Sequence, residues 1–295
     1  MSIGRILILL ALLAGIAPAA LAEVSIRSMN FPAWVERGEL RVPVAPGDSL
    51  QVGDILQTGD NGRVWLQVKG GQVIKLGQAS RIALERADYR GEGDDAVFVA
   101  GFNLLNGVFR YTSRFFILQR AARLEVDFRI GSSTIELDSA DVYARAGNNE
   151  GQVLLLDGRI AITSPGQPAV ILDEPLSHFN TAKKNSAGSI ERLDAAIVES
   201  LSAETDLDAS LGVAKTTGLK VLVLRSFANP SRADAEVARL QQSGYAARAR
   251  AVEINGAPYT RVQLEGLESR AAAANLRRWL IDTGLIEDAW IDVNI

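Results

Sequence analysis

Apolar and polar residues alternate in steps of two along residues 40–165, and Gly, Asp and Asn interrupt the alternation at short intervals. Residues 64–68 alternate in this way, and Gly70-Gly71 separates them from the next apolar run. Asp157-Gly158 separates two further runs, which predicts a second hairpin. A period of two is typical of strands that bury one face. The pattern therefore predicts an all-β N-terminal domain over residues 23–165, with a sandwich or barrel-like fold.

Residues 219–295 follow a different pattern, in the order strand, helix, strand, strand, helix, strand. Each predicted helix begins at a capping residue and ends at a glycine, from Asn229 to Gly244 and from Ser269 to Gly284. Asn255-Gly256 predicts a hairpin between the two middle strands. The order predicts an α+β, ferredoxin-like domain with a four-stranded antiparallel sheet and both helices on one face. The chain is therefore expected to be multidomain, with an open sheet face that offers a binding platform.

The segment between the two domains, residues 166–218, carries eight acidic and four basic residues and many turn-forming ones. Ile190, Leu193, Ile197 and Leu201 recur at helical spacing, so one helix is expected within it. These features predict an acidic linker between two domains that fold independently. Limited proteolysis is then expected to give two stable fragments that part in this segment.

Residues 1–22 have the order of a secretory signal peptide. Arg5 supplies the positive charge, residues 6–16 are apolar, and Ala20-Leu21-Ala22 forms a cleavage site. Cleavage after Ala22 predicts a periplasmic protein without a stable membrane anchor. An uncleaved N-terminal anchor is the alternative, although the apolar run is shorter than the roughly 20 residues that span a bilayer.

Composition narrows the function. The chain has no Cys and one His, His178, so thiolate zinc sites, cysteine nucleophiles and Ser-His-Asp chemistry are not expected. A formal net charge of −4 argues against nucleic-acid binding, which requires an excess of Lys and Arg. Asp and Glu are abundant, but no pair of them has a recognisable catalytic arrangement. We therefore expect a binding protein rather than an enzyme, with no metal and no cofactor.

Part of the N-terminal domain is similar to a known family. The residues that carry the similarity are Trp34-Val35-Glu36-Arg37-Gly38, the run from Val44 to Gly59, Gly62-Arg63-Val64-Trp65-Leu66, Leu105-Asn106-Gly107-Val108-Phe109 and Ala140-Asp141-Val142-Tyr143-Ala144-Arg145. Residues 34–163 thereby resemble a FecR-type periplasmic domain. In signalling members of that family, the domain relays receptor occupancy to a sigma factor through a membrane helix. Here a predicted signal peptide stands in place of that helix, so the signalling role is not expected to transfer.

The C-terminal domain also resembles a family along residues 219–295. The matching residues are Val223 to Asn229, Ala233 to Leu240, Gly244-Tyr245, Tyr259-Thr260-Arg261-Val262, Ser269-Arg270 and Ala289-Trp290-Ile291. They are similar to the SPOR (sporulation-related repeat) family. This resemblance implies binding to septal peptidoglycan glycan strands that have lost their stem peptides.

The resemblance also implies a set of glycan-binding residues: Ser226, Tyr259, Arg261 and Trp290. Two positions depart from the family pattern, because Val223 stands where many members have Gln and Arg225 where they have Gly. Arg225 is therefore added to the set as a substitute for the missing amide. Packing in the core is the alternative role of Trp290, and it is the role expected for Trp279.

Together these features predict a periplasmic, non-catalytic protein that binds peptidoglycan through residues 219–295. The FecR-like module would serve as a scaffold for envelope or cell-division proteins. One alternative is an envelope signalling adaptor, in which the FecR-like domain binds a receptor or regulator and the C-terminal domain only tethers it. Another is an accessory subunit of a cell-wall hydrolase.

Overall fold

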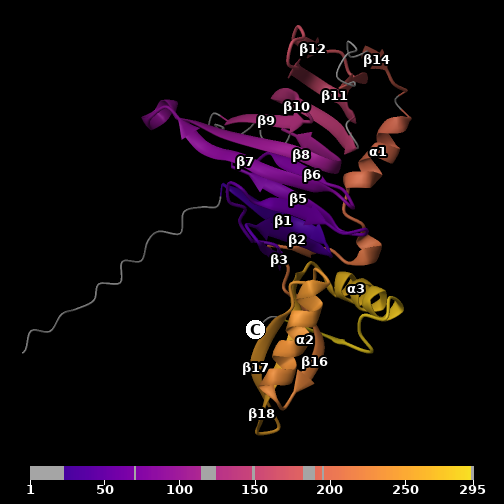
Figure 1. The fold of residues 1–295 in the computed structure, drawn as a ribbon. Helices are drawn as coiled ribbons and strands as arrows, with labels where there is room; N and C mark the ends of the chain where they lie inside the picture. The colour runs from indigo at the N-terminus through magenta and orange to yellow at the C-terminus, as the bar shows by residue number, and fades with distance from the viewer. Residues whose placement is uncertain are drawn as a thin grey trace, which may run out of the picture.

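A computed structural model describes residues 23–69, 71–113, 124–147, 150–181, 190–194 and 196–293 of the chain. It contains a large N-terminal β domain and a smaller C-terminal α+β domain, which lie at opposite ends of the molecule in Figure 1. The predicted signal peptide, residues 1–22, lies outside the described residues. Among the described residues no helix is both long and apolar enough to cross a bilayer.

The N-terminal domain is built from antiparallel strands, with one parallel pair. The strands are β1 (Val24–Asn30), β2 (Ala33–Arg37), β3 (Leu40–Pro43), β4 (Ile55–Thr58), β5 (Arg63–Val68), β6 (Val73–Leu76), β7 (Arg81–Arg90), β8 (Val97–Thr112), β9 (Leu124–Ile130), β10 (Ser133–Gly147), β11 (Glu150–Thr163), β12 (Val170–Leu172), β13 (Ser177–Thr181) and β14 (Ile190–Arg192). β8 and β9 form the parallel pair. The predicted all-β class of this domain is confirmed.

Alternating apolar side chains of these strands fill the core. Phe128 of β9 is fully buried, and its ring stacks on Phe109 of β8 with 4.1 Å between the ring centroids. Phe102 also stacks on Phe128, with 5.2 Å between the ring centroids. Aromatic pairs at these distances contribute packing beyond the area that they bury. The apolar residues that recur with a period of two in the sequence are thus the ones whose side chains point into this core.

Asp157-Gly158 does not form the predicted hairpin turn. β11 runs through both residues and pairs with β10 on each side of them, with a shift of register near Asp141. Gly158 has a φ of 88°, and a Cβ there would lie 2.1 Å from the Ser139 carbonyl oxygen. A left-handed glycine can serve a β-bulge as well as a turn. The same two residues therefore bend a long strand instead of reversing the chain.

An ion pair between the exposed Arg37 and the buried Asp54 holds the turn before β4. Arg37 donates two hydrogen bonds to the Asp54 carboxylate, at 2.8 and 2.6 Å, and the Gln51 backbone N–H donates a third at 2.8 Å. Burial alone would raise the pKa of Asp54, but these hydrogen bonds hold that pKa below its usual value. The carboxylate form is thus favoured in the folded state.

Because the folded pKa of Asp54 is lowered, its stabilising effect is present above the unfolded pKa of about 3.9 and is lost as pH falls through the folded value. The substitution Asp54→Asn is therefore expected to lower the free energy of unfolding at pH 7 and to have a smaller effect in acid. Denaturant unfolding of both proteins between pH 2 and 7 measures this difference. An Arg37→Leu background should reduce the pH dependence, and a difference that is constant over the whole range would contradict the assignment.

The segment predicted to be a linker, residues 166–218, has structure of its own. β12 and β13 pair with β11, and β14 pairs with β13, so its first part extends the N-terminal sheet. One helix follows, α1 (Ile197–Thr205), as expected. Its start is later than the spacing predicted, because Ile190 lies in β14 rather than in the helix. The domain boundaries stay a prediction, but in the described part of this segment β12 and β13 pair with the β domain.

Polar contacts dock α1 and the residue after it on the β domain. The Trp65 indole N–H donates to the Thr205 carbonyl oxygen at 3.0 Å, and Lys75 forms an ion pair with Asp206 at 2.5 Å. Glu204 accepts hydrogen bonds from Tyr143 at 2.8 Å and from Arg145 at 2.6 Å. Burial and the Glu204 contact raise the pKa of Tyr143, so its hydroxyl stays a donor.

The C-terminal domain has the predicted ferredoxin-like order: β16 (Lys220–Phe227), α2 (Pro230–Gln242), β17 (Arg248–Ile254), β18 (Ala257–Leu267), α3 (Arg270–Asp282) and β19 (Trp290–Val293). The Asn229 side chain accepts from the Ser231 N–H and that of Ser269 from the Ala272 N–H, so both predicted helix caps are present. Asn255 and Gly256 both have positive φ, as a tight hairpin turn requires. The fold class predicted for this domain is confirmed.

The two domains share backbone hydrogen bonds. β15 (Ala214–Lys215) pairs with β1 on one side and with β18 on the other. The Ala33 N–H also donates directly to the Gly244 carbonyl oxygen at 3.2 Å. The ring centroids of Phe31 and Tyr245 are 5.8 Å apart across the boundary. The domains are therefore docked on one another through strands and buried rings.

Candidate functional site

The candidate site is the sheet face that the helices leave open. The strands lie in the order β17-β18-β16-β19, and all three pairings are antiparallel. Leu222, Leu224 and Leu264 belong to the core beneath the helices. Val223 and Trp290 face each other across β16 and β19; Val223 is fully buried, but it does not belong to the cluster beneath the helices. Residues paired with Val223 therefore point away from the helices.

Three of the predicted site residues meet on this open face. Ser226 on β16 lies directly opposite Arg261 on β18, and Tyr259 lies two residues before Arg261 on the same strand. Side chains two residues apart in a strand share a face. The Ser226 hydroxyl is buried and has no hydrogen-bond partner among the described residues. Tyr259, Arg261 and Ser226 thus share this face, with the Ser226 hydroxyl buried beneath the larger side chains.

Trp290 is the fourth member of this face. Its side chain is 43% exposed, so the alternative role in the core does not describe its position. The Arg261 guanidinium carbon lies 5.9 Å from the centroid of the Trp290 ring. Arg261 also donates to Asp292 at 3.0 Å, which fixes the guanidinium group beside the indole. An exposed ring next to a fixed fork of donors suits a ligand with a flat apolar side and polar edges.

A comparison with protein families identifies the domain that contains this sheet. Residues 217–283 match the family model of the SPOR domain. This segment is a SPOR domain. SPOR domains bind peptidoglycan, and the family is one of binding domains and not of enzymes. The resemblance of residues 34–163 to a FecR-type domain stays a prediction.

Other comparisons add little. No curated protein matches the chain at a significant level. Two crystal structures of a provisionally assigned anti-sigma factor from Parabacteroides distasonis ATCC 8503, at 1.65 and 2.50 Å resolution, match with 12% and 11% sequence identity. The matches cover 68% and 69% of this chain and 95% and 96% of the other chain, and both have a TM-score of 0.37. At that TM-score the similarity carries no argument about this chain.

Gln263 is a residue of the SPOR sheet that the sequence reasoning missed. It pairs directly with Val223, so its amide lies on the open face where the departure from the family pattern occurs. Its Nε2 donates to Glu265 at 2.9 Å. The neighbouring strand thus carries a buried amide opposite Val223. Gln263 is two residues after Arg261, so the alternation that places Tyr259 and Arg261 on one face also predicts Gln263 there.

Charged side chains border the face on the β17 side. Glu265 accepts hydrogen bonds from Arg250 at 2.9 Å and from Gln263. Burial would raise the pKa of the Glu265 carboxyl, but these two donors hold it below its usual value. Arg248 contacts the same carboxylate at 4.0 Å. The positive charge on this side is therefore partly neutralised, which suits a ligand without strong charge.

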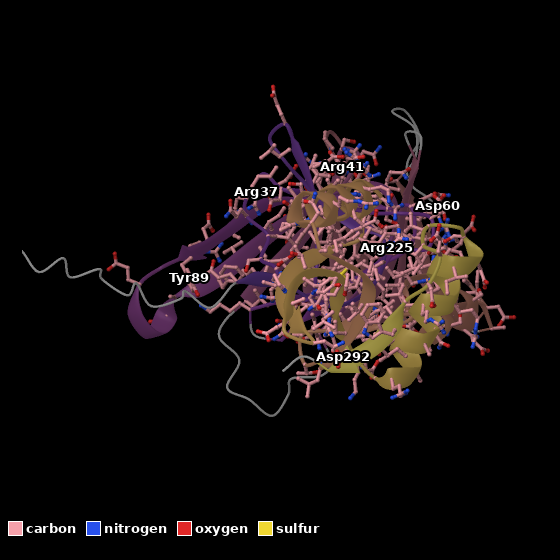
Figure 2. All side chains as sticks on the ribbon, turned by 90° about the horizontal axis from the view of Figure 1, so that it is seen from below. Arg37, Arg41, Asp60, Tyr89, Arg225 and Asp292 are labelled. Carbon is pink, nitrogen blue, oxygen red and sulfur yellow. The ribbon has the colours of Figure 1, made fainter. Side chains whose placement is uncertain are left out.

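Arg225 does not share the open face with the other four predicted residues. A bulge in β16 follows Val223, and Arg225 pairs with the buried Val262, so it points toward the helices. Its guanidinium group lies 3.4 Å from Glu287. Hydrogen bonds from Arg239 lower the pKa of Glu236 on α2, and the charge of Arg225 adds to this effect. Figure 2 shows Arg225 and Asp292 among the side chains at this end of the molecule. Arg225 therefore does not replace the missing amide on the open face.

Arg225 does line a groove at the edge of the same sheet. β19 pairs only with the first half of β16, which leaves the edge of Leu224–Phe227 without β19 as a partner. The groove there has a volume of about 490 Å³ and is bounded by Arg225, Ser226 and Trp290. A chain-like ligand on the open face could continue into this groove past Trp290.

The described residues contain no cluster of three or more His, Asp or Glu side chains placed to hold a metal ion. His178, the single histidine, lies on β13 beside β11 and β14, far along the chain from the SPOR sheet. Burial lowers its pKa. The site that the residues do form is suited to binding through rings and hydrogen bonds.

Proposed function

We propose that the protein is a periplasmic, non-catalytic component of the cell envelope that holds peptidoglycan glycan strands on the open face of its SPOR sheet. The observation that carries this proposal is the common face of Ser226, Tyr259, Arg261 and Trp290, with Trp290 exposed. We include Gln263 in the proposed set because it pairs with Val223 on that face. Peptide-stripped strands, as at the septum, are the proposed form of the ligand.

The chemistry of the face fits a neutral sugar chain. The flat apolar face of a sugar ring can lie on the Trp290 indole or the Tyr259 ring. Sugar hydroxyls both donate and accept hydrogen bonds, and Ser226 and Gln263 can do the same, while Arg261 donates from a fixed position. Stem peptides would add bulk and charge over this narrow set of contacts. Their removal should therefore favour binding.

The β domain is proposed to act as a scaffold that presents the SPOR sheet. The docked interface supports this role, because β15 and the Ala33–Gly244 hydrogen bond hold the SPOR domain in one orientation. In that orientation Trp290 stays exposed. Envelope or cell-division proteins are the proposed partners of the β domain.

Tyr259→Ala, Arg261→Ala and Trp290→Ala are each expected to weaken binding of the full chain to peptide-stripped sacculi. A lost contact of about 1 kcal/mol corresponds to roughly fivefold weaker binding. The free energy of unfolding should change by about 0.5 kcal/mol or less for the exposed Trp290. Co-sedimentation with stripped and intact sacculi measures binding, and denaturant unfolding measures stability.

Tyr89→Ala is the matched control, since Tyr89 is 45% exposed on β7 of the other domain. It should bind sacculi like the unsubstituted protein. If all three SPOR variants also bind normally, the open face is not the glycan site. If Trp290→Ala unfolds the protein, Trp290 belongs to the core and leaves the proposed set.

A further inference from the structure

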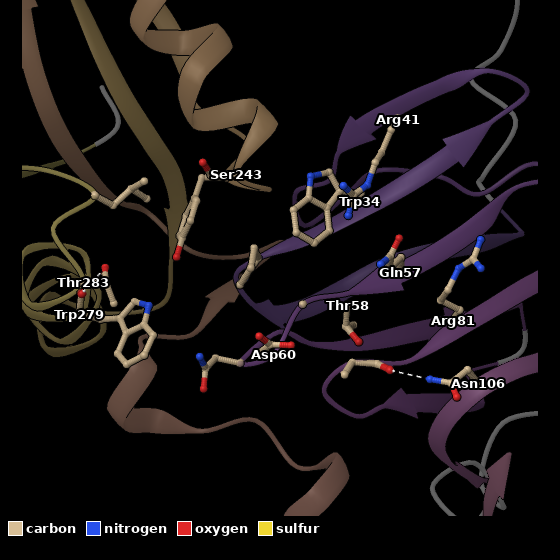
Figure 3. A pocket seen from close by; sticks show the side chains of 16 residues that line it. Trp34, Arg41, Gln57, Thr58, Asp60, Arg81, Asn106, Ser243, Trp279 and Thr283 are labelled. Atoms are coloured by element: carbon tan, nitrogen blue, oxygen red, sulfur yellow. Dashed lines mark hydrogen bonds between the residues drawn. The ribbon is translucent and has the colours of Figure 1, made fainter. Parts of the chain in front are cut away.

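A cleft lies between the two domains, next to the C-terminal ends of α2 and α3. Its volume is about 560 Å³, within the range of about 300–1,000 Å³ typical of small-molecule sites. The wall from the β domain includes Trp34, Gln57, Asp60 and Asn61, and the wall from the SPOR domain includes Tyr245 and Trp279. Figure 3 shows Trp34 and Trp279 projecting from the two walls, with Asp60 on the turn between them. None of these residues belongs to the open SPOR face.

Polar groups of the β-domain wall are available to a ligand. Gln57 and Asn61 are half-buried and Asp60 is exposed. In the part of the chain that the structure describes, none of these three side chains has a hydrogen bond or an ion pair. Amide groups carry both donors and acceptors, so each of them can serve a hydroxyl group in either role.

The SPOR wall supplies an aromatic platform with a fixed orientation. Trp279 lies on α3, is half-buried and packs against the core cluster. A hydrogen bond links Trp279 to the buried Tyr245 hydroxyl; burial raises the pKa of Tyr245, and this bond acts in the opposite direction. The remainder of Trp279 lines the cleft. A ring held in this way loses little freedom when a ligand stacks on it.

Trp34 forms the opposite end of the cleft. The Arg41 guanidinium carbon lies 3.9 Å from the centroid of its ring, so a planar cation covers one face of the indole. The indole side chain is 91% buried, yet its Nε1 has no hydrogen-bond partner among the described residues. A buried donor without a partner is costly in a native protein. The indole edge next to Nε1 lies against Gly244, so Trp34 supplies an apolar wall to the cleft.

The charges of the cleft point to a neutral ligand. Arg81 at its rim is paired with Glu36 at 2.7 Å. Arg41 and Asp60 have opposite charges and line the same space. A strongly anionic ligand would meet Asp60, and a strongly cationic one would meet Arg41 and Arg81. A neutral ring with many hydroxyl or amide groups meets neither difficulty.

From this combination of two indoles, unpaired amides and balanced charge, we propose that the cleft between the domains binds a neutral saccharide of one or a few rings. A ring stacks on Trp279, and its hydroxyl groups bond to Gln57, Asn61 and Asp60. This site goes beyond the proposed function, because it lies outside the SPOR sheet and requires residues of both domains. Docking of the domains is what brings its two walls together.

The test uses the full chain carrying Trp290→Ala, which removes the exposed ring of the SPOR sheet. The probe is the neutral tetramer of β-1,4-linked N-acetylglucosamine, followed by calorimetry and by tryptophan fluorescence. The tetramer should still bind, and adding Gln57→Ala or Asn61→Ala should weaken its binding by about three- to tenfold. Trp279→Phe should remove most of the fluorescence change, because the indole that contacts the sugar is gone.

Matched controls lie outside the cleft. Gln67→Ala changes an exposed glutamine of β5, and Trp65→Phe changes an indole that bonds to Thr205. Both should leave tetramer binding and its fluorescence change as they were. Inorganic phosphate at millimolar concentration should not compete, and competition would overturn the assignment to a neutral saccharide.

The outcomes separate this inference from the proposed function. If Trp290→Ala removes all tetramer binding, the cleft proposal is overturned and the open SPOR face is supported. If Gln57→Ala and Asn61→Ala bind as well as Gln67→Ala, the cleft proposal is likewise overturned. If the cleft variants weaken tetramer binding while Tyr259→Ala and Trp290→Ala bind sacculi normally, the cleft is supported and the proposed role of the sheet is wrong.

Discussion

Replacement of Asn30 by alanine is expected to lower the free energy of unfolding by about 3 kcal/mol or more. Asn30 is fully buried at the end of β1, and its side chain makes three hydrogen bonds to the segment before the SPOR domain. Its Nδ2 donates to the carbonyl oxygens of Asp208 and Gly212, both at 2.9 Å, and its Oδ1 accepts from the Asp208 N–H at 2.8 Å. The substitution leaves three backbone groups without partners, and each such loss costs about 1–3 kcal/mol.

Denaturant unfolding of the full chain measures this loss, with Asn103→Ala as the matched control. The Asn103 amide donates to Glu85 at the surface, so its removal should cost about 0.5 kcal/mol or less. Asn30→Ala should also speed proteolytic cleavage near residues 206–218, because cleavage follows the population of the locally opened form. Equal stability of the two variants would show that Asn30 does not hold this segment.

Gly244→Ala is expected to cost about 3 kcal/mol, more than the backbone conformation alone explains. Gly244 ends α2 with a φ of 84°, which costs an L-residue about 1–2 kcal/mol. A Cβ at this position would also lie 2.4 Å from Cζ2 of Trp34 and 2.6 Å from Cβ of Pro32, both on the other domain. The clash can be relieved only by moving the domains apart or by rotating the buried indole.

Gly256→Ala separates the two effects. Gly256 has nearly the same φ, 80°, but a Cβ there meets nothing within 4 Å. It should therefore show only the backbone cost of about 1–2 kcal/mol. The difference between the two variants, measured by denaturant unfolding, reports the packing between the domains. If the variants are equally stable, the domains are not docked in solution as the structure has them.

The same packing links stability to the cleft. Trp34 contacts the SPOR domain next to Gly244 and also lines the space proposed for a saccharide. A ligand that contacts both walls binds only the docked arrangement. Mass action then stabilises that arrangement when the ligand is present. Saccharide binding should accordingly be weaker in Gly244→Ala than in Gly256→Ala.

Much of the SPOR domain could be predicted from the sequence because its signals are local. Asn229 and Ser269 cap the helices that follow them, and Asn255-Gly256 turns the hairpin, through hydrogen bonds and φ values set by neighbouring residues. The two-residue period likewise places Tyr259 and Arg261 on one face. No distant part of the chain is needed for any of these features.

The position of Arg225 could not be predicted in this way. Simple alternation places Arg225 on the same face as Val223, whereas the bulge after Val223 moves Ser226 to that face and turns Arg225 toward the helices. A bulge depends on the register of the partner strand, which the residues of β16 do not encode by themselves. Asp157-Gly158 is a second case, since its positive φ fits a turn and a bulge equally well.

The sequence by itself determined the all-β class of the first domain, the order of strands and helices in the second, the SPOR assignment and the shared face of Tyr259 and Arg261, since each depends on residues close together in the chain. The tertiary structure decided how residues 166–218 pack, where Trp290 is exposed, and which residues form the cleft. Asn30 contacts residues 208 and 212, and Trp34 contacts Gly244, across most of the length of the chain. Contacts of this kind depend on the folded shapes of both segments. The residue pattern of one segment therefore cannot predict which residues of the other segment it will contact.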